Sequence, residues 1–231
     1  MYFHHCVQQF TTTGQNSQFL GAFLGAFFAF FFGLIAFFVT TNISNKRKRF
    51  IKHKNAIVKL EQLLNTHIDE VTIAQYTAKS IQEILESGAF VTARFNKFKL
   101  INDLPFELAS INLINKYFEY SRNMVRFNLD FSSINYSLTR FEDAVLANIK
   151  LSEDNRKYLI KAVSDKPKIL NHLEADTKEF LAIVRLYLSK IRNCNPTICG
   201  MLEKFDPEIT PEELSAELVK LEEEISRKEA M

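Results

Sequence analysis

The pattern of hydrophobic positions begins with one unbroken apolar run. Residues 19–39 are 21 consecutive positions without a charge, an amide or a hydroxyl. At a helical rise of about 1.5 Å per residue the run spans about 31 Å, the thickness of a bilayer's hydrocarbon core. It therefore predicts a single transmembrane helix, placed at residues 19–40, with residues 1–18 as a short tail on the far side of the membrane.

Beyond this run, apolar residues recur every three or four positions, which is the period of amphipathic helices. A first helix is expected from the membrane to about residue 64 and onward toward Gly88, which suits a left-handed C-cap. A second pattern follows Pro105 for about 40 residues, a length typical of bundles and coiled coils. Its apolar positions are Ile111, Ile114, Phe118, Val125, Leu129, Leu138, Phe141, Val145 and Ile149.

A third helical pattern begins after Ser152, an N-cap followed by acidic residues, and continues to about residue 192. Pro167 must kink or split this helix, because its ring removes a hydrogen bond and clashes with the preceding turn. Asp165 or Lys166 can cap the new start. Residues 55–192 are therefore expected to form a helical bundle.

Two segments lack a clear period. In residues 89–104 the aromatic Phe90, Phe95 and Phe98 alternate with basic residues. We expect a short helix or turn whose aromatic rings fill the bundle while the cations face water. The same composition also suits a membrane surface or single-stranded nucleic acid. Residues 193–209 contain two prolines and a glycine and are predicted to be a linker.

The last segment, residues 210–231, carries a strong helix start. Thr210 is an N-cap, Pro211 stands at the first helical position and Glu213 completes a capping box. The apolar stripe is narrow, so the helix is expected to dock on the bundle or on another chain. The residues proposed for docking a partner helix are Leu214, Leu218, Leu221 and Ile225.

Charge orients the predicted span. No Lys or Arg precedes it, whereas residues 46–54 carry six, so a cleaved signal peptide is disfavoured. The positive-inside rule then predicts a single-pass protein of the plasma (inner) membrane with a cytoplasmic C-terminal domain. The basic juxtamembrane segment, residues 41–54, is expected to contact anionic lipid headgroups, and no nucleic acid partner is expected. Its cations are Lys46, Arg47, Lys48, Arg49, Lys52 and Lys54.

Small residues recur at every fourth position inside the span. Helices associate in bilayers by close backbone approach, which small residues permit, so this stripe predicts homo-oligomerisation. The stripe consists of Gly21, Gly25, Ala29 and Gly33.

The sequence contains no phosphate-binding loop, nucleophile elbow or zinc-protease helix. Cys194 and Cys199 are interpreted as ordinary thiols in a reducing cytoplasm rather than as metal ligands. His67 and His172 stand near acids but do not form the Glu-x-x-His pair of di-iron bundles. We therefore expect no catalytic site, no metal and no cofactor.

Together these patterns predict an all-α protein, with one N-terminal transmembrane helix followed by a cytoplasmic helical bundle or coiled-coil-like domain. The function expected from them is that of a non-enzymatic, membrane-anchored interaction or scaffold protein. It would self-associate through its span and present the domain to a cytoplasmic protein partner. The alternative is a membrane-acting effector, such as a toxin or defence component, whose assembled span perturbs the bilayer.

Overall fold

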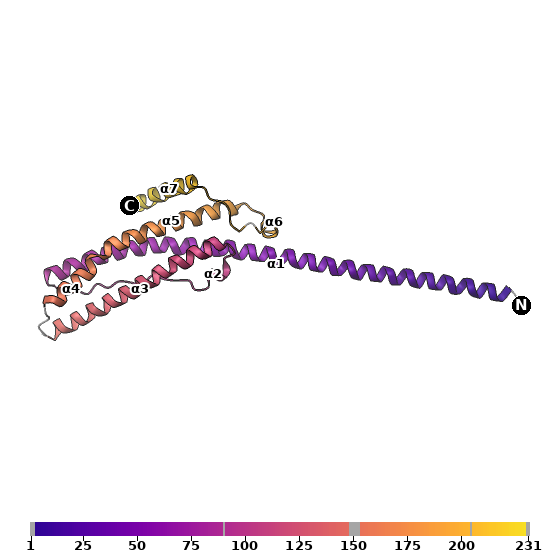
Figure 1. Ribbon diagram of the computed structural model, residues 1–231, viewed down its shortest axis with the longest axis horizontal. Coiled ribbons are helices and arrows are strands. Elements are labelled where there is room, and N and C mark those ends of the chain that lie inside the picture. The colour runs from indigo at the N-terminus through magenta and orange to yellow at the C-terminus, as the bar shows by residue number, and fades with distance from the viewer. Residues whose placement is uncertain (1–2, 90, 148–152, 204, 230–231) are drawn as a thin grey trace.

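A computed structural model describes residues 3–89, 91–147, 153–203 and 205–229, with side chains from residue 21 onward. In these residues the protein is all-α, as predicted, and one helix projects far beyond a bundle formed by the others (Figure 1). The helices are α1 (Phe3–Ser87), α2 (Leu104–Glu107), α3 (Ile111–Leu146), α4 (Glu153–Ser164), α5 (Lys166–Arg192), α6 (Pro196–Met201) and α7 (Pro211–Glu229).

Helix α1 is one continuous helix of 85 residues that contains both the apolar run and one wall of the bundle. No Gly or Pro stands between Gly33 and Gly88, so no residue with poor helix propensity interrupts it there. The C-cap is confirmed, because Gly88 has φ +77° and its amide bonds the carbonyl of Leu85. Residues 3–18 and 41–54, expected as a tail and a juxtamembrane segment, belong to the same helix.

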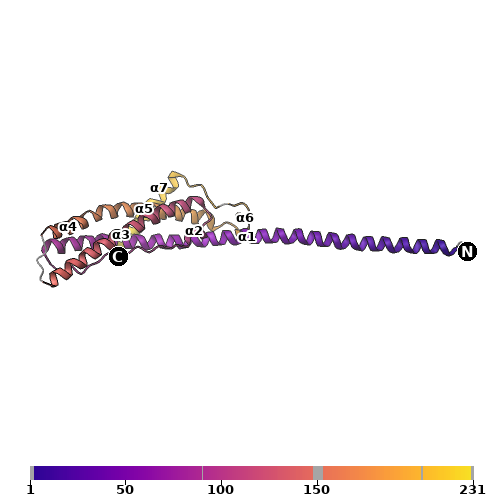
Figure 2. The ribbon, with the colours of Figure 1, turned by 60° about the horizontal axis from the view of Figure 1, so that its bottom comes forward.

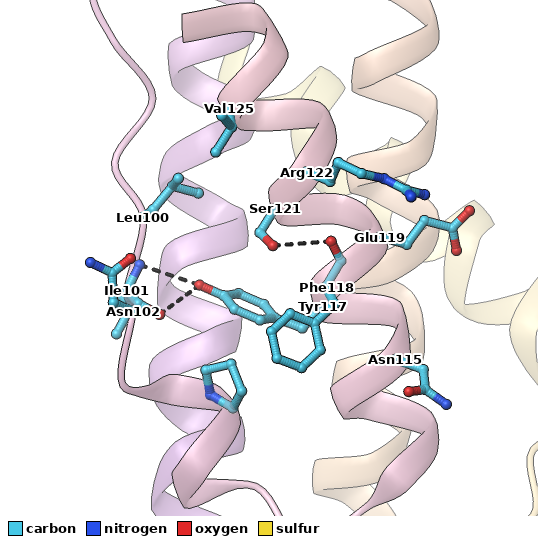
Figure 3. A pocket seen from close by; sticks show the side chains of 11 residues that line it. Leu100, Ile101, Asn102, Asn115, Tyr117, Phe118, Glu119, Ser121, Arg122 and Val125 are labelled. Atoms are coloured by element: carbon cyan, nitrogen blue, oxygen red, sulfur yellow. Dashed lines mark hydrogen bonds between the residues drawn. The ribbon is translucent and has the colours of Figure 1, made fainter.

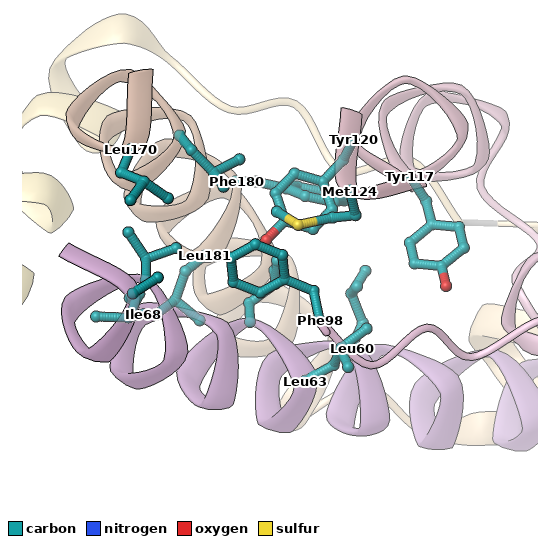
Figure 4. Close-up of a cluster of buried hydrophobic side chains, with 14 of the residues drawn as sticks. Leu60, Leu63, Ile68, Phe98, Tyr117, Tyr120, Met124, Leu170, Phe180 and Leu181 are labelled. Atoms are coloured by element: carbon teal, nitrogen blue, oxygen red, sulfur yellow. The ribbon is translucent and has the colours of Figure 1, made fainter. Parts of the chain in front are cut away.

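The apolar core lies between α1, α5 and α3 (Figure 4). Helices α4 and α5 pack along α1, and α7 covers α5. The core joins Leu60 of α1, Met124 of α3 and Phe180 of α5, all of them fully buried. Residues 91–103, which we name the extended segment, run through the space between α1 and α3 and form no helix, only a turn before α2. The prediction of a short helix in this segment is wrong. The burial predicted for Phe95 and Phe98 is confirmed, and Phe90 lies outside the described residues.

The helix expected after Pro105 is divided. Pro105 stands in the first turn of the short α2, and Ser110 then caps the long α3 by accepting a hydrogen bond from the amide of Leu113 at 3.0 Å. The predicted apolar positions of α3 fall on two opposite faces. Leu138 and Phe141 are buried, whereas Ile111, Phe118, Val125 and Leu129 are exposed on the opposite side. Val145 lies on the side of Leu138 and is exposed close to the end of the helix. Ile149 lies outside the described residues.

The buried face of α3 is richer in aromatic residues than the exposed one. It consists of Leu113, Tyr117, Tyr120, Met124, Phe131, Ile134, Leu138 and Phe141. The predicted apolar positions include only Leu138 and Phe141 of this face, so most of the prediction assigned the wrong face of α3 to the core.

The split before Pro167 is confirmed. Helix α4 ends at Ser164, and α5 starts at Lys166 with Asp165 in the N-cap position. Lys166 is buried and forms an ion pair with Asp130 of α3, which joins the start of α5 to α3. The N-cap expected at Ser152 lies outside the described residues.

The C-terminal region folds back along the bundle (Figure 2). The residues expected as a linker, 193–209, contain α6, which packs on α1. The capping box of α7 is confirmed: the Thr210 amide donates to Glu213 Oε2 at 2.9 Å, and the Glu213 amide donates to Thr210 Oγ1 at 3.3 Å.

Candidate functional site

The junction between α6 and the basic segment of α1 is the first candidate site. A Cβ added to Gly200 of α6 would lie 2.6 Å from the carbonyl oxygen of Lys46, so only glycine allows this backbone contact. In both views α6 is the part of the folded domain that reaches furthest along α1 toward the N-terminus (Figures 1 and 2). The C-terminal region therefore meets α1 just after the apolar run ends.

The predicted lipid-binding cations divide into two groups at this junction. Lys46 pairs with Glu203 at 3.3 Å, the Arg49 guanidinium lies 5.1 Å from the centre of the Phe205 ring, and Lys54 donates to the Arg192 carbonyl at 3.2 Å. Lys46 and Arg49 hold the C-terminal region against α1, and Lys54 holds the end of α5 there. Arg47, Lys48 and Lys52 are exposed. Half of the basic segment thus has a structural role that the sequence did not reveal.

Beneath the cations lies a buried aromatic cluster. The Phe205 ring centre lies 6.1 Å from that of Phe50 and 5.4 Å from that of His53. The His53 ring is buried, and its Nδ1 accepts a hydrogen bond from the Ala109 amide at 3.1 Å. In the described part of the chain its Nε2 has no hydrogen-bond partner. Burial lowers the pKa of His53 from 6.5 to about 4, so the ring is neutral at pH 7.

Asp206 connects this cluster to the rest of the bundle. Its carboxylate accepts hydrogen bonds from the hydroxyl groups of Ser110 and, at 3.3 Å, Tyr187. Because Ser110 also caps α3, one carboxylate links the C-terminal region to α3 and α5. The only sequence signal was Asp206-Pro207, which had been interpreted as part of a linker.

A second polar feature holds the extended segment in place. Asn128 Nδ2 donates to the Phe98 carbonyl at 2.9 Å, and its Oδ1 accepts from the Phe98 amide at 2.7 Å. Asn135 makes the same two bonds with Phe95, at 2.8 and 2.9 Å. An extended chain with no neighbouring strand needs such partners for its peptide groups. The two asparagines supply them as a strand would.

The spacing of the two asparagines along α3 equals the spacing of the two phenylalanines along the extended segment. Asn128 and Asn135 are seven helical residues apart, about 10 Å along the axis. Phe95 and Phe98 are three extended residues apart, also about 10 Å. The segment and α3 run in opposite directions, so the higher-numbered asparagine meets the lower-numbered phenylalanine. We name this arrangement the asparagine clamp.

His67 of α1 holds the same segment from the other side. Its Nε2 donates to the Lys99 carbonyl at 2.7 Å, so in the neutral ring Nδ1 accepts from the Tyr120 hydroxyl at 2.8 Å. The Tyr120 hydroxyl also lies 3.1 Å from Thr177 Oγ1. Burial lowers the pKa of His67 and raises that of Tyr120. His67, Tyr120 and Thr177 thus pair their polar atoms with one another inside the core. We interpret this hydrogen-bonded chain as structural.

An open groove of about 660 Å³ lies where the extended segment passes α3 (Figure 3). Leu100, Phe118 and Val125 supply apolar walls, and Arg122 stands at the edge. The Tyr117 hydroxyl is already engaged, because it donates to the Ile101 carbonyl at 2.7 Å and accepts from the Ile101 amide at 3.3 Å. The residues that line the groove also include the exposed carboxylate of Glu119. Within the described ranges, no three His, Cys, Asp or Glu residues lie close enough to hold a metal.

The small-residue stripe is uncovered. A Cβ added to Gly21, Gly25 or Gly33 would find no atom within 4 Å, and Ala29 is exposed. Helix α1 is long and apolar enough to cross a membrane over this region. The stripe is therefore available for contact with another molecule, and its role in self-association remains a prediction.

The stripe proposed for docking a partner helix is used within the chain. Leu221 of α7 is buried, and Ile225 packs against the core. Leu214 and Leu218 are half-buried on the same side. Arg185 of α5 binds Glu224 at 2.8 Å, which supports the same position of α7. A partner approaching α7 would meet its acidic outer face instead.

Cys194 and Cys199 are joined as a disulfide, with their Cα atoms 6.2 Å apart. The pairing disagrees with the expectation of a reducing compartment for this domain. Their proximity also follows from the fold alone, because Asn195 caps α6 through the amides of Thr197 and Ile198 and so turns the chain back between the two cysteines.

Comparison of the chain with protein-family models, curated proteins and solved structures finds no match. The surfaces of the folded chain must therefore carry the functional argument.

Proposed function

We propose that this protein is a membrane-anchored, non-enzymatic interaction protein that self-associates. The observation that supports it best is an uncovered apolar stripe on α3. Its residues are Ile111, Phe118, Val125, Leu129 and Tyr136, which are between 44 % and 68 % exposed. They follow one another at intervals of seven, seven, four and seven residues, so they lie along one line of the helix, opposite its buried face. We name them the α3 stripe.

The proposed occupant of the α3 stripe is a second copy of this chain. Intervals of seven and four are those by which helices pair in coiled coils. Copies anchored in one membrane share one orientation, so two identical stripes meet in parallel with matching register. Large uncovered apolar faces are uncommon on monomeric proteins. The small-residue stripe of the span offers a second self-complementary face in the same chain.

Membrane anchoring is supported by the apolar part of α1, in which no residue from Gly21 to Val39 is buried in the folded chain. A cytoplasmic domain is supported by the six cations that follow the span and the absence of any before it. The Cys194–Cys199 pair argues for the opposite side. We give more weight to the charges, because the fold already brings these two residues together.

Self-association is tested on the full chain in detergent micelles by a mass measurement of the protein component. Val125→Glu with Leu129→Glu is expected to lower the oligomer mass, because it places charges within the α3 stripe. Gly25→Leu tests the span in the same way. Tyr76→Glu is the matched control, since Tyr76 is 69 % exposed on α1 away from both stripes. A wild-type protein that is a strict monomer overturns self-association.

The orientation is tested with Lys97→Cys, an exposed position on the extended segment, in a chain that also carries Cys6→Ser, because Cys6 in the outer tail would itself react. A membrane-impermeant thiol reagent is expected to label this residue only after the cells are opened. Labelling of intact cells would place the domain outside the cell, the location that the Cys194–Cys199 disulfide favours, and would overturn the cytoplasmic orientation.

A further inference from the structure

Helix α6 and its C-cap residue, Leu202, expose three apolar side chains on one side. Ile198, Met201 and Leu202 are between 48 % and 60 % exposed. Intervals of three and one residues place them together on the helix surface. Cys199 and Gly200 face the other way and are buried against the chain. The C-terminal region thus carries a small apolar face with no covering element among the described residues.

The position of this face relative to the span is fixed by a backbone contact. Gly200 meets the carbonyl of Lys46, and no side chain larger than hydrogen fits between them. Lys46 comes seven residues after Val39, the last residue of the apolar run, which is about 10 Å along α1. The headgroup layer on each side of a bilayer is about 5–8 Å thick. With the run placed across the hydrocarbon core, α6 lies at the outer edge of the headgroups.

The positive charge beside this apolar face also suits the headgroup layer of a membrane. Arg47 and Lys48 are exposed at the level of α6, and Lys52 follows one turn later. Glu203, the acidic residue at the end of α6, is paired with Lys46 at 3.3 Å. An apolar face flanked by exposed cations is characteristic of elements that lie in the membrane interface.

We propose that α6 is a second membrane-contacting element, which lays Ile198, Met201 and Leu202 onto a bilayer surface of anionic phospholipids beside the end of the span. This inference rests on the proposed anchoring by α1. Contact at two points, the span and α6, fixes how the domain stands on the membrane.

The chain contains no tryptophan, so one introduced tryptophan is a clean fluorescent reporter. The full chain carrying Leu202→Trp is reconstituted into vesicles of phosphatidylcholine and phosphatidylglycerol, with bromine on acyl carbons close to the headgroup. Bromine quenches a nearby indole, so a loss of fluorescence is expected. Tyr76→Trp is the matched control, because it lies 37 residues beyond Val39 on α1, about 55 Å from the span, and should keep its fluorescence.

Phe38→Trp, inside the apolar run, separates the two hypotheses. If Phe38→Trp is quenched and Leu202→Trp is not, α6 does not contact lipid, and the anchoring stands. If Phe38→Trp is itself unquenched, the anchoring fails and the inference fails with it. Vesicles of phosphatidylcholine alone should quench Leu202→Trp less. Equal quenching in both lipids overturns the role given to anionic headgroups.

Discussion

The asparagine clamp makes a prediction that can be worked out from individual bonds. Asn128→Leu keeps the branched shape of the side chain and improves helix propensity, but its methyl groups neither donate nor accept, so it removes both hydrogen bonds to Phe98. The substitution leaves the Phe98 amide and carbonyl without partners inside the domain. Each unsatisfied buried group costs about 1–3 kcal/mol, and partial access of water to the segment favours the lower half. We expect about 2–4 kcal/mol of lost stability, a large part of the 5–15 kcal/mol typical of a domain.

The assay is urea unfolding of the full chain in detergent micelles, followed by circular dichroism at a helical band. Asn115→Leu is the matched control, because Asn115 is exposed on the same helix. It should unfold at the wild-type urea midpoint or slightly above. Amide hydrogen exchange at Phe98 should accelerate in Asn128→Leu. A midpoint equal to that of the control would refute the clamp as a source of stability.

Combining Asn128→Leu with Asn135→Leu extends the test. Both asparagines hold one segment, so releasing either end should loosen the other. The double variant should therefore lose less than the sum of the single losses, because neighbouring sites that share a partner are not additive.

Three further outcomes follow from the junction and the C-terminal helix. Below pH 6.5 the unfolded chain binds a proton at His53, whereas the folded domain, in which the His53 pKa is about 4, does not. The free energy of unfolding should therefore be full above pH 6.5 and fall by about 3 kcal/mol toward pH 4. Urea midpoints measured against pH should show a smaller fall in His53→Gln. Equal pH slopes for wild type and variant would contradict this. Gly200→Ala should destabilise the domain by about 1–3 kcal/mol in urea unfolding, because its Cβ meets the Lys46 carbonyl, whereas Gly33→Ala, with open space around it, should not. Thr210→Ala removes half of the capping box and should lower stability by about 1 kcal/mol and increase amide exchange in α7, and an unchanged exchange pattern would argue against the cap.

Local signals predicted much of the fold. Gly88, Pro167 and Thr210 each act on the few residues around them, and the structure ends, splits or starts a helix at each one. The apolar run of α1 is likewise a property of consecutive residues. These features need no knowledge of what lies across the bundle, which is why the sequence was enough.

The orientation of α3 needed information from elsewhere in the chain. Both of its faces are apolar at helical spacing, so periodicity alone cannot choose the one that is buried. The extended segment makes the choice, because its peptide groups require hydrogen-bond partners. Asn128 and Asn135 lie close to the aromatic face and supply those partners, so that face turns inward. Of five asparagines in this helix, the sequence could not distinguish these two from those that face water.

The junction was hidden for the same reason. The cations of residues 46–54 were recognised as a group, but Glu203 and Phe205, which engage two of them, stand about 150 residues away in the sequence. Nothing in either segment alone indicates the other. They are brought together in the fold by the backbone contact at Gly200 and by the packing of Phe205 on Phe50 and His53.

The continuity of α1 connects the two proposed self-association faces. A helix without Gly or Pro between residues 33 and 88 transmits rotation of the span directly to the bundle. Pairing through the small-residue stripe would therefore fix the direction in which the α3 stripe of each copy points. If both faces meet in one dimer, Gly25→Leu and Leu129→Glu must weaken it cooperatively, because each interface positions the other. If the faces point in different directions, the two substitutions act independently, and the chain has one face for pairing and a second for building larger assemblies.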